Sequence, residues 1–484
     1  MKFFKLFSAF MLAGILSGCY SHRPSMGAGQ TSFHPPRRID PRNIAVPAGY
    51  RIEVVANGLT FPTGITFDED GTPVVVESGY AYGEKWTTPR LVRVEPDGSL
   101  VPVASGGMNG PWNGVSFDHG NFYVAEGGER EGGRILKISS DGQVTMLISN
   151  LPSLGDHHTD GPVIGPDGKI YFGQGTASNA GIVGPDNMKF GWLARHPEFH
   201  DIPGQDITLT GQNITSPDVL RGHGRARTGA FVPFGTRTFP GQVIPGGLPC
   251  NGSVMAISPD GGDLQLVAWG FRNPFGLAFD PNGKLFVTDN GYDDRGSRPV
   301  WGVSDLLWSV NQGTWYGWPD FTGNDSLSDK AYQPPHKKRI WPLIADPPNV
   351  PPAPVAHLGV HVGAAGLDFS RSEQFGHVGE AFVALFGDEA PNVGKTLHPV
   401  GCRVVRVNVK EGIIEDFAVN FGRHNGPASK IGGGGLERPI AVRFSPDGNA
   451  LYVVDFGVMT ENHRGDHPRT GTGVLWRITW EGPE

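Results

Sequence analysis

Short apolar runs recur along the whole chain, and each is followed by a polar turn and a second segment in which apolar and polar residues alternate. Most copies of this pattern begin with Gly or Ala, and most contain Asp-Gly or Asn-Gly in the turn. The six copies start at Gly64, Gly114, Val163, Gly276, Gly366 and Ala441, and the fifth is the weakest. Because both turn residues must tolerate positive φ, Asp-Gly between alternating strands is a strong hairpin signal. The pattern therefore predicts six β-hairpins.

Further alternating segments follow the copies and supply matching outer strands. They are 91–94, 134–138, 254–257, 306–310, 404–409 and 474–478. Six copies of a roughly four-stranded unit predict an all-β fold, a six-bladed β-propeller with long inserted loops. Residues 51–55 are expected to close the ring by pairing with the last blade near 474–480. A large sandwich would not explain six similar copies.

The composition fits a fold with many turns. The 484 residues include 72 Gly and 42 Pro, a share just under the level typical of disordered chains. However, the 10% aromatic content and the 11 Trp argue for a packed core. Few windows long enough for a helix lack both Gly and Pro, so long helices are not expected.

The uneven spacing of the copies predicts where loops are inserted into the propeller domain, 47–484. The first three copies start about 50 residues apart, whereas the third and fourth are separated by more than 100. Insertions are expected at about 177–250, 293–304 and 320–356. Long loops on one face of a propeller commonly build or cover a site.

The N-terminus predicts export and lipid attachment. A charged start and a short apolar stretch form a signal peptide over 1–18. The cut region reads Leu16-Ser17-Gly18-Cys19. It resembles the bacterial lipobox, which implies that Cys19 is lipidated and that 19–46 form a flexible tether in the cell envelope. Tyr20 after the Cys favours the periplasmic side of the outer membrane, and an ordinary secretory signal with a chance Cys is the alternative.

Charge and cysteine content exclude some classes. The net charge is −8 and no basic patch is present, so nucleic acid is not an expected partner. Beyond the signal, only Cys250 and Cys402 remain. Whether they pair is left open, and the absence of CxxCH means that the chain carries no c-type haem of its own.

The fourth copy carries an ordered set of motifs. They are Gly270-Phe271-Arg272-Asn273-Pro274-Phe275-Gly276, Thr288-Asp289-Asn290-Gly291-Tyr292, Asp305 and Trp315-Tyr316-Gly317-Trp318-Pro319. This order resembles the soluble glucose and aldose sugar dehydrogenases that depend on pyrroloquinoline quinone (PQQ), the glucose/sorbosone dehydrogenase family. The family signature is G-[HF]-R-N-P-x-G followed later by N-Y-G-W-P, and the spacing matches over about 50 residues with one insertion at 293–304.

The resemblance implies a cofactor and a metal. Arg272 and Asn273 match cofactor contacts, and PQQ, a tricarboxylate, requires cations in its site. The family's Ca²⁺, which prefers oxygen ligands, is held partly by backbone carbonyls that match Gly291 and Tyr292. Asp305 is a candidate contributor to the same site. The alternatives are a salt bridge that caps the blade for Arg272 and a turn residue for Asp305.

The third copy is preceded by Asp156-His157-His158-Thr159-Asp160-Gly161. In the family a His here takes the proton from the anomeric hydroxyl, and hydride passes to the quinone, which calcium polarises. Histidine suits this role because its pKa lies near neutral pH. Counting back from the following Gly-Pro-Asp-Gly turn favours His157, a shift of one residue gives His158, and a pair of surface His that binds an adventitious metal is the alternative.

Two departures concern this base. The family's H-x-[SG]-G-R has Gly161 in place of its Arg, and the Asp that supports the base aligns with Thr176. The base is therefore expected to be less well oriented unless Asp156 or Asp160 substitutes.

The fifth blade offers further cations for the cofactor. The resemblance suggests Arg403, Arg406 and a preceding Lys395. Arg403 and Arg406 differ by three positions in a strand, so they are expected on opposite faces, and Arg403 is favoured. Arg438-Pro439 matches the family's R-P in the sixth blade, with a purely structural role as the equal alternative.

The resemblance as a whole implies a dehydrogenase dependent on PQQ and Ca²⁺. It would oxidise the anomeric hydroxyl of an aldose sugar, or a related polyol or aldehyde, and pass electrons to a separate acceptor, a cytochrome or quinone. The alternatives are a non-catalytic, surface-anchored binding propeller and a calcium-dependent propeller lactonase.

Overall fold

The computed structural model describes residues 36–81, 85–335, 337, 339–394, 396, 398–422, 425–462 and 465–482. The predicted signal peptide, Cys19, most of the predicted tether and Lys395 lie outside the described residues.

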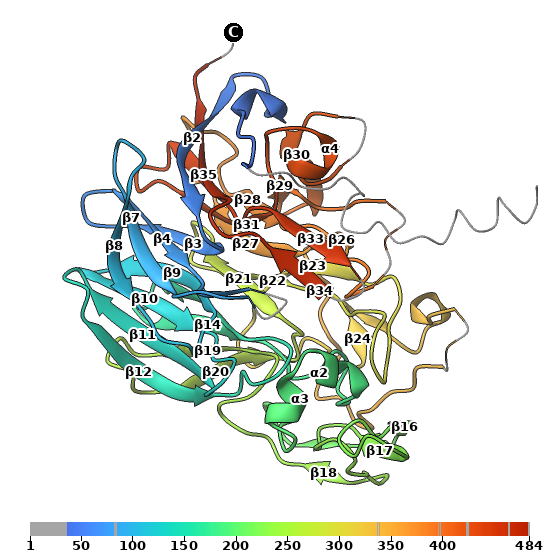
Figure 1. Cartoon of the computed structure of the whole chain (residues 1–484). Coiled ribbons are helices and arrows are strands. Elements are labelled where there is room, and N and C mark those ends of the chain that lie inside the picture. Colours follow the sequence, from blue (N-terminus) through green and yellow to red (C-terminus); the bar gives the residue numbers. More distant parts are fainter. Residues whose placement is uncertain are drawn as a thin grey trace, which may run out of the picture.

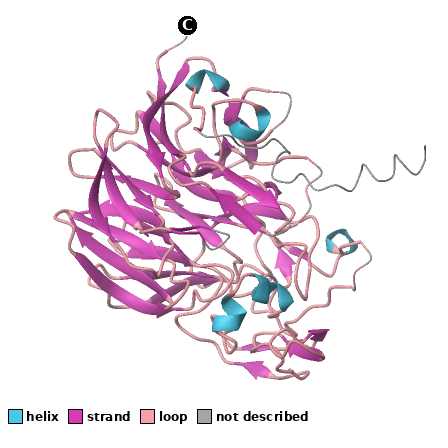
Figure 2. Ribbon diagram, viewed as in Figure 1, coloured by secondary structure: helices cyan, strands magenta, loops and turns pink. Residues whose placement is uncertain are grey.

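Six antiparallel sheets form the body of the molecule (Figures 1 and 2). In blade order their strands are β3 (Pro62–Phe67), β4 (Pro73–Glu77), β7 (Arg90–Val94) and β8 (Leu100–Ser105); β9 (Trp112–Asp118), β10 (Asn121–Glu126), β11 (Gly133–Ser139) and β12 (Val144–Leu151); β13 (Thr159–Ile164), β14 (Ile170–Gln174), β19 (Ser253–Ile257) and β20 (Gln265–Trp269); β21 (Pro274–Phe279), β22 (Leu285–Asp289), β23 (Ser304–Ser309) and β26 (Ala356–Val360); β27 (Ala364–Phe369), β28 (Ala381–Leu385), β29 (Arg403–Asn408) and β30 (Ile413–Asn420); and β31 (Pro439–Phe444), β32 (Ala450–Asp455), β35 (Gly473–Trp480) and β2 (Tyr50–Leu59). The first strand of each sheet contacts the first strands of both neighbouring sheets, so the sheets close a ring. The predicted six-bladed β-propeller is confirmed.

The ring closes between the two ends of the propeller. Strand β2 pairs with β35, and Arg51 lies opposite Thr479, as predicted. The prediction of a flexible tether up to residue 46 is wrong for its last part. Strand β1 (Ile44–Ala45) pairs with β30, and the buried Arg37 guanidinium lies 2.5 Å from Asp455 Oδ2. Backbone pairing and a buried ion pair thus fix this segment to the propeller.

The glycines of the repeat allow the inner strands to approach closely. Gly114 has a φ of +81°, and a Cβ placed there would lie 2.1 Å from the carbonyl oxygen of Gly161 in the next blade. A Cβ on Gly276 would lie 2.3 Å from the carbonyl oxygen of Ala365. These inner positions therefore require glycine, because neighbouring backbones occupy the space of a side chain.

The long insertions pack together into one accessory lobe beside the propeller (Figure 1). Its elements are α2 (Pro185–Lys189), α3 (Trp192–Arg195), β15 (Ile207–Thr208), β16 (Asn213–Pro217), β17 (Arg225–Gly229), β18 (Val243–Ile244), β24 (Phe321–Thr322), β25 (Asp325–Ser326) and the 3₁₀-helix η3 (Lys330–Tyr332). Residues from all three predicted insertions share one apolar cluster, in which Phe231, Val300 and Ile344 are buried. Leu209 also forms a β-bridge with Ile344.

Four small elements complete the structure. They are η2 (Pro41–Asn43), α4 (Ala428–Ile431) and the hairpins β5 (Tyr80–Ala81) with β6 (Lys85–Trp86) and β33 (Met459–Asn462) with β34 (Gly465–Pro468). Within the described residues every helix is too short and too polar to span a bilayer. Cys250 and Cys402 are both buried and unpaired, so they form no disulfide with each other.

Candidate active site

A cavity of ≈ 210 Å³ is bordered by residues of all six blades. A second hollow of ≈ 20 Å³ lies behind the loop that contains Gly291. Since one water occupies about 10–15 Å³ on this measure, the second hollow holds little more than a water, whereas the first takes an organic ligand. The accessory lobe supplies part of the wall of the larger cavity through Phe190 and Trp192.

His157 borders this cavity and is held in one tautomer. Its Nδ1 lies 3.0 Å from the carbonyl oxygen of Thr176 and 3.1 Å from Thr176 Oγ1, which itself donates to the carbonyl oxygen of Ser178. A carbonyl oxygen can only accept, so Nδ1 donates and Nε2 carries the lone pair. Burial, followed by Arg272 and Arg295, lowers the pKa of His157 well below its usual value. His157 is therefore a neutral base at neutral pH.

Thr176 replaces the carboxylate that the family resemblance places behind this base. Neither Asp156 nor Asp160, the two carboxylates suggested as substitutes, is hydrogen-bonded to the His157 ring among the described residues. Asp156 accepts hydrogen bonds from Asn187 (2.8 Å) and Trp192 (2.7 Å), while Asp160 accepts one from Asn113 (2.8 Å). A backbone carbonyl thus supplies the orientation, which local sequence could not reveal because any residue carries that group.

His158 has a different environment. Its Nδ1 lies 3.3 Å from the carbonyl oxygen of Ser153, and its Nε2 lies 3.6 Å from Glu129 Oε2. Glu129 in turn pairs with Arg195. Burial lowers the pKa of His158 to about 4. His158 Nε2 therefore has a carboxylate oxygen beside it, whereas no acidic side chain among the described residues lies within ion-pair distance of His157.

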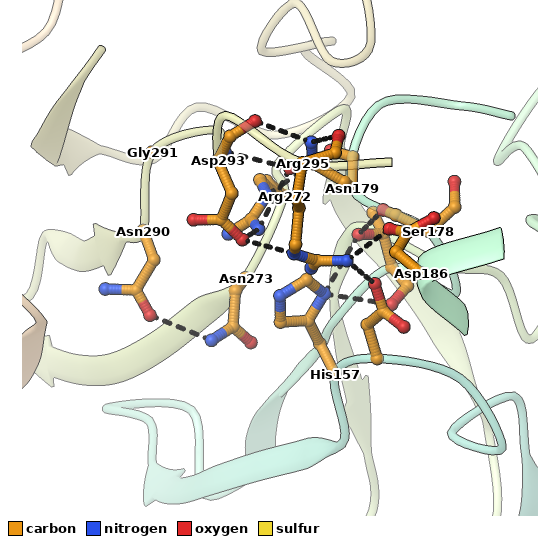
Figure 3. A network of polar contacts seen from close by, with 12 residues as sticks. His157, Ser178, Asn179, Asp186, Arg272, Asn273, Asn290, Gly291, Asp293 and Arg295 are labelled. Atoms are coloured by element: carbon orange, nitrogen blue, oxygen red, sulfur yellow. Dashed lines mark hydrogen bonds and ion pairs between the residues drawn. The ribbon is translucent and has the colours of Figure 1, made fainter. Parts of the chain in front are cut away.

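Arg272 belongs to a buried ionic network (Figure 3). Its Nη2 lies 2.5 Å from Asp293 Oδ2, and Asp293 also accepts a hydrogen bond from Arg295 Nε at 2.9 Å. Arg295 Nη1 contacts Asp156 at 2.8 Å and Asp186 at 2.6 Å. Burial raises the pKa of Asp293, but the two guanidinium groups outweigh it and hold that pKa below its usual value. The network fixes the position of Arg272 in the cavity wall.

Sequence reasoning missed Asp293 and Arg295, although both line the cavity. They stand in the predicted 293–304 insertion, whose family counterpart is missing, so no motif marks them. The available signal was the charged run Asp293-Asp294-Arg295 immediately after Gly291-Tyr292.

Asn273 presents an unused acceptor at the cavity. Asp289 accepts hydrogen bonds from the backbone N–H groups of Arg272 (3.0 Å) and Asn273 (2.7 Å) and so holds the turn before β21. Asn273 Nδ2 donates to Asn290 Oδ1 at 2.9 Å. Asn273 Oδ1 is buried and has no hydrogen-bond partner among the described residues. Such an acceptor fits a donor group or a cation of a ligand.

Gly291 and Asp305 both border the cavity, whereas Tyr292, whose backbone carbonyl was the predicted ligand, does not. Asp305 Oδ1 accepts from the Gly291 N–H at 2.8 Å, and its Oδ2 accepts from the Ala364 N–H at 2.9 Å. Asp305 therefore fixes the loop that carries Gly291. The Tyr292 side chain is buried in the accessory lobe, where its hydroxyl donates to the carbonyl oxygen of Phe321.

The cavity residues fit Ca²⁺ and PQQ in kind. Within the described chain no three His, Cys, Asp or Glu side chains are grouped to hold a metal, so a calcium ion here depends on amide and carbonyl oxygens such as Asn273 Oδ1. Arg272 Nη1 has no hydrogen-bond acceptor in the described part of the chain, which leaves it available for a carboxylate. Phe275, Phe386 and Phe456 give the cavity apolar surface for a planar ring system.

The two arginines predicted in the fifth blade do not reach the cavity. Arg403 Nη1 lies 2.7 Å from Asp416, and Arg406 pairs with Glu380 and Glu415. Neither arginine borders the cavity. Acidic residues on the strands beside β29 attract both side chains, so the expectation that they contact the cofactor is wrong.

The chain resembles a curated quinoprotein in part of its sequence. No family model matches the chain. Quinoprotein glucose dehydrogenase B of Acinetobacter calcoaceticus is 28% identical over 188 residues, which cover 38% of this chain and 30% of that protein. The predicted resemblance to PQQ-dependent sugar dehydrogenases is confirmed. Because the match spans less than a third of that relative, the similarity does not by itself assign an activity to this chain.

Several solved structures share the fold. The holo PQQ domain of pyranose dehydrogenase from Coprinopsis cinerea has a TM-score of 0.55 and 15% identity, covering 92% of this chain and 98% of that one. A calcium structure of a family AA12 enzyme from Trichoderma reesei has a TM-score of 0.53 and 15% identity, with coverage of 92% and 98%. The apo aldose sugar dehydrogenase of Escherichia coli gives a TM-score of 0.50 and 15% identity, with coverage of 90% and 100%.

Proposed function

We propose that this protein is a PQQ- and calcium-dependent dehydrogenase that oxidises the anomeric hydroxyl of an aldose sugar or a related polyol or aldehyde. The observation that carries the proposal is His157, a neutral base held in one tautomer in the same cavity as Arg272 and Asn273. A calcium-dependent lactonase, which needs side-chain carboxylates around its metal, receives no such support from the described residues.

Each cavity residue has a distinct role in this proposal. His157 Nε2 accepts the proton of the substrate hydroxyl. Arg272 pairs with a cofactor carboxylate through Nη1, while Asn273 Oδ1 and the Gly291 loop offer oxygen atoms to the metal. When bound, PQQ supplies the acceptor for the hydride and calcium polarises it. The buried walls exclude bulk water and strengthen these electrostatic contacts.

Reconstitution tests the proposal directly. Purified apo-protein is mixed with PQQ and Ca²⁺, and dye reduction is followed over a panel of aldoses and polyols. We expect a cofactor absorption spectrum and reduction with at least one sugar. His157→Ala is expected to lower the turnover rate about 10²- to 10⁴-fold while PQQ still binds.

The matched variant is His158→Ala, whose turnover is expected to fall far less. If His158→Ala abolishes turnover instead, His158 is the base. Absence of both cofactor binding and dye reduction with every substrate would contradict the proposed function.

The location and electron transfer are also proposals. Electrons are passed to a separate acceptor, a cytochrome or quinone. Lipidation of Cys19 would hold the propeller at the periplasmic side of the outer membrane, and the lipobox-like sequence supports this. Cys19→Ala is then expected to release the protein from the membrane fraction, and retention of that variant in membranes would contradict the anchor.

A further inference from the structure

A buried carboxyl group near the propeller axis is left partly unpaired. Asp160 lies near the start of β13, is 1% exposed and borders the cavity. Asn113 Nδ2, from β9 of the neighbouring blade, donates to its Oδ1 at 2.8 Å. Its Oδ2 is buried without a hydrogen-bond partner among the described residues. A buried polar atom without a partner is unfavourable, so Asp160 Oδ2 is suited to a hydrogen-bond partner that the described residues do not supply.

The hydrogen bond from Asn113 determines which oxygen carries the proton. Because the amide N–H donates to Oδ1, that oxygen is an acceptor and the acid proton resides on Oδ2. Burial raises the pKa of Asp160 well above its usual value, and the Asn113 hydrogen bond opposes this only in part. Burial therefore favours the protonated form of Asp160, which carries its O–H group on the unpaired oxygen.

Few charged or titratable groups lie on the elements that pack against Asp160. On the packed elements, Glu126 of β10 pairs with Arg134 of β11 at 2.9 Å, and Arg272 before β21 pairs with Asp293. His157 and His158 precede Asp160 on its own segment, and burial lowers the pKa of both. In the described part of the chain none of these groups forms an ion pair with Asp160. The carboxyl thus gains little from ionising.

We propose that Asp160 donates a hydrogen bond to an oxygen atom of the substrate and so determines which sugars bind. The inference rests on the proposed function, because a sugar held with its anomeric hydroxyl at His157 has further oxygens that the adjoining wall can reach. A neutral donor suits hydroxyl or ring oxygens, which carry no charge. A site that hydrogen-bonds a substrate oxygen rejects analogues that lack it.

Kinetics of the holoenzyme with a series of monodeoxy sugars tests this role. We expect the wild type to show an approximately tenfold higher KM for one deoxy analogue. Asp160→Ala should raise KM for the parent sugar by about tenfold, change kcat less, and abolish discrimination against that analogue. Asp160→Asn should recover most of the lost affinity, because its Oδ1 still accepts from Asn113 while its Nδ2 donates to the cavity.

The pH dependence separates this role from a structural one. In the wild type KM should rise with increasing pH as Asp160 ionises and loses its donor. In Asp160→Asn the donor cannot ionise, so KM should lack this rise. An equal KM increase in the Asn and Ala variants, or unchanged deoxysugar discrimination in Asp160→Ala, would overturn the proposal and leave Asp160 as an interface partner of Asn113.

Infrared spectroscopy supplies a readout that needs no turnover. We expect a protonated carboxyl band at neutral pH that Asp160→Asn lacks and that shifts when sugar is added. Asp447→Asn, at an exposed turn, is the matched control and should keep the band. Failure of every sugar to reduce dye would refute the proposed function, whereas an absent band, or one unmoved by sugar, would refute the role of Asp160.

Discussion

The fourth and sixth blades hold the start of their inner strands with the same pair of hydrogen bonds. Only in the fourth blade does a residue held in this way border the cavity and keep an unpaired side-chain oxygen. In each blade an Asp at the end of the second strand accepts the backbone N–H groups of the two residues before a Pro. In the fourth blade Asp289 holds Arg272 and Asn273, and in the sixth Asp455 holds Glu437 (2.9 Å) and Arg438 (2.8 Å).

The side chains at the matching positions differ in how fully they are paired. Arg438, which corresponds to Asn273, is fully buried, pairs with Glu461, and donates to the carbonyl oxygens of Phe386, Gly387 and Asp388. Asn273 keeps an unpaired Oδ1 at the cavity wall. Both terminal guanidinium nitrogens of Arg438 are thus bound by the protein itself and only its Nε lacks a partner among the described residues, whereas the residue with the unpaired oxygen in the fourth blade borders the cavity. This favours the structural alternative for Arg438.

The largest expected effect is on the stability of the sixth blade. Arg438→Ala should lower the free energy of unfolding by about 3–5 kcal/mol, because it removes one partner of a buried ion pair. Chemical denaturation measures the change. Arg443→Ala in β31, the strand that follows Arg438, is the control, since Arg443 is partly exposed and lies 3.9 Å from Asp368. Its loss should stay below about 1 kcal/mol. If both variants lost the same free energy of unfolding, the buried ion pair of Arg438 would stabilise the protein no more than the partly exposed contact of Arg443. The proposed contrast between the sixth and fourth blades would then fail.

A smaller effect is expected from the pH dependence of the sixth blade. Burial raises the pKa of Glu437 from 4.5 to about 7, whereas the matching position of the fourth blade is an arginine, Arg272. The folded state therefore binds the proton more tightly than the unfolded state, and stability falls as pH rises from about 4.5 through 7.

Glu437→Gln should abolish the part of the free energy of unfolding that depends on the protonation of Glu437. Relative to the wild type, the variant should gain about 2 kcal/mol in the free energy of unfolding between pH 5 and pH 8. Urea denaturation at the two pH values measures the gain. Asp280→Asn, at the half-buried residue before the outer turn of the fourth blade, is the control. A difference between Glu437→Gln and wild type that does not change with pH would show that Glu437 does not titrate in this window.

The blade comparison also explains what the sequence could predict. The inner strands were predictable because turn residues and close-packed glycines such as Gly114 and Gly276 mark them locally. Arg272 and Asn273 were found because they are contiguous with such a strand. Asp293 was not found, because it lies in an insertion that folds back, and the role of Thr176 was not, because its backbone carbonyl carries it. Strand periodicity could not predict where side chains on β29 find their partners, which are acidic residues of neighbouring strands.

The smallest effect on stability, and the one most specific to the fourth blade, is expected at Asn273. Asn273→Ala removes the hydrogen bond to Asn290, so the free energy of unfolding should fall by only about 1 kcal/mol. The affinity for PQQ with Ca²⁺ should fall by about tenfold, because Oδ1 is lost from the cavity. Isothermal titration of apo-protein measures the affinity, and Asn282→Ala at the exposed outer turn of the same blade should leave it unchanged. If Asn273→Ala instead weakens folding as strongly as Arg438→Ala and leaves cofactor affinity intact, the fourth blade is closed on itself like the sixth. In that case the unpaired oxygen of Asn273 has a structural rather than a ligand-binding explanation.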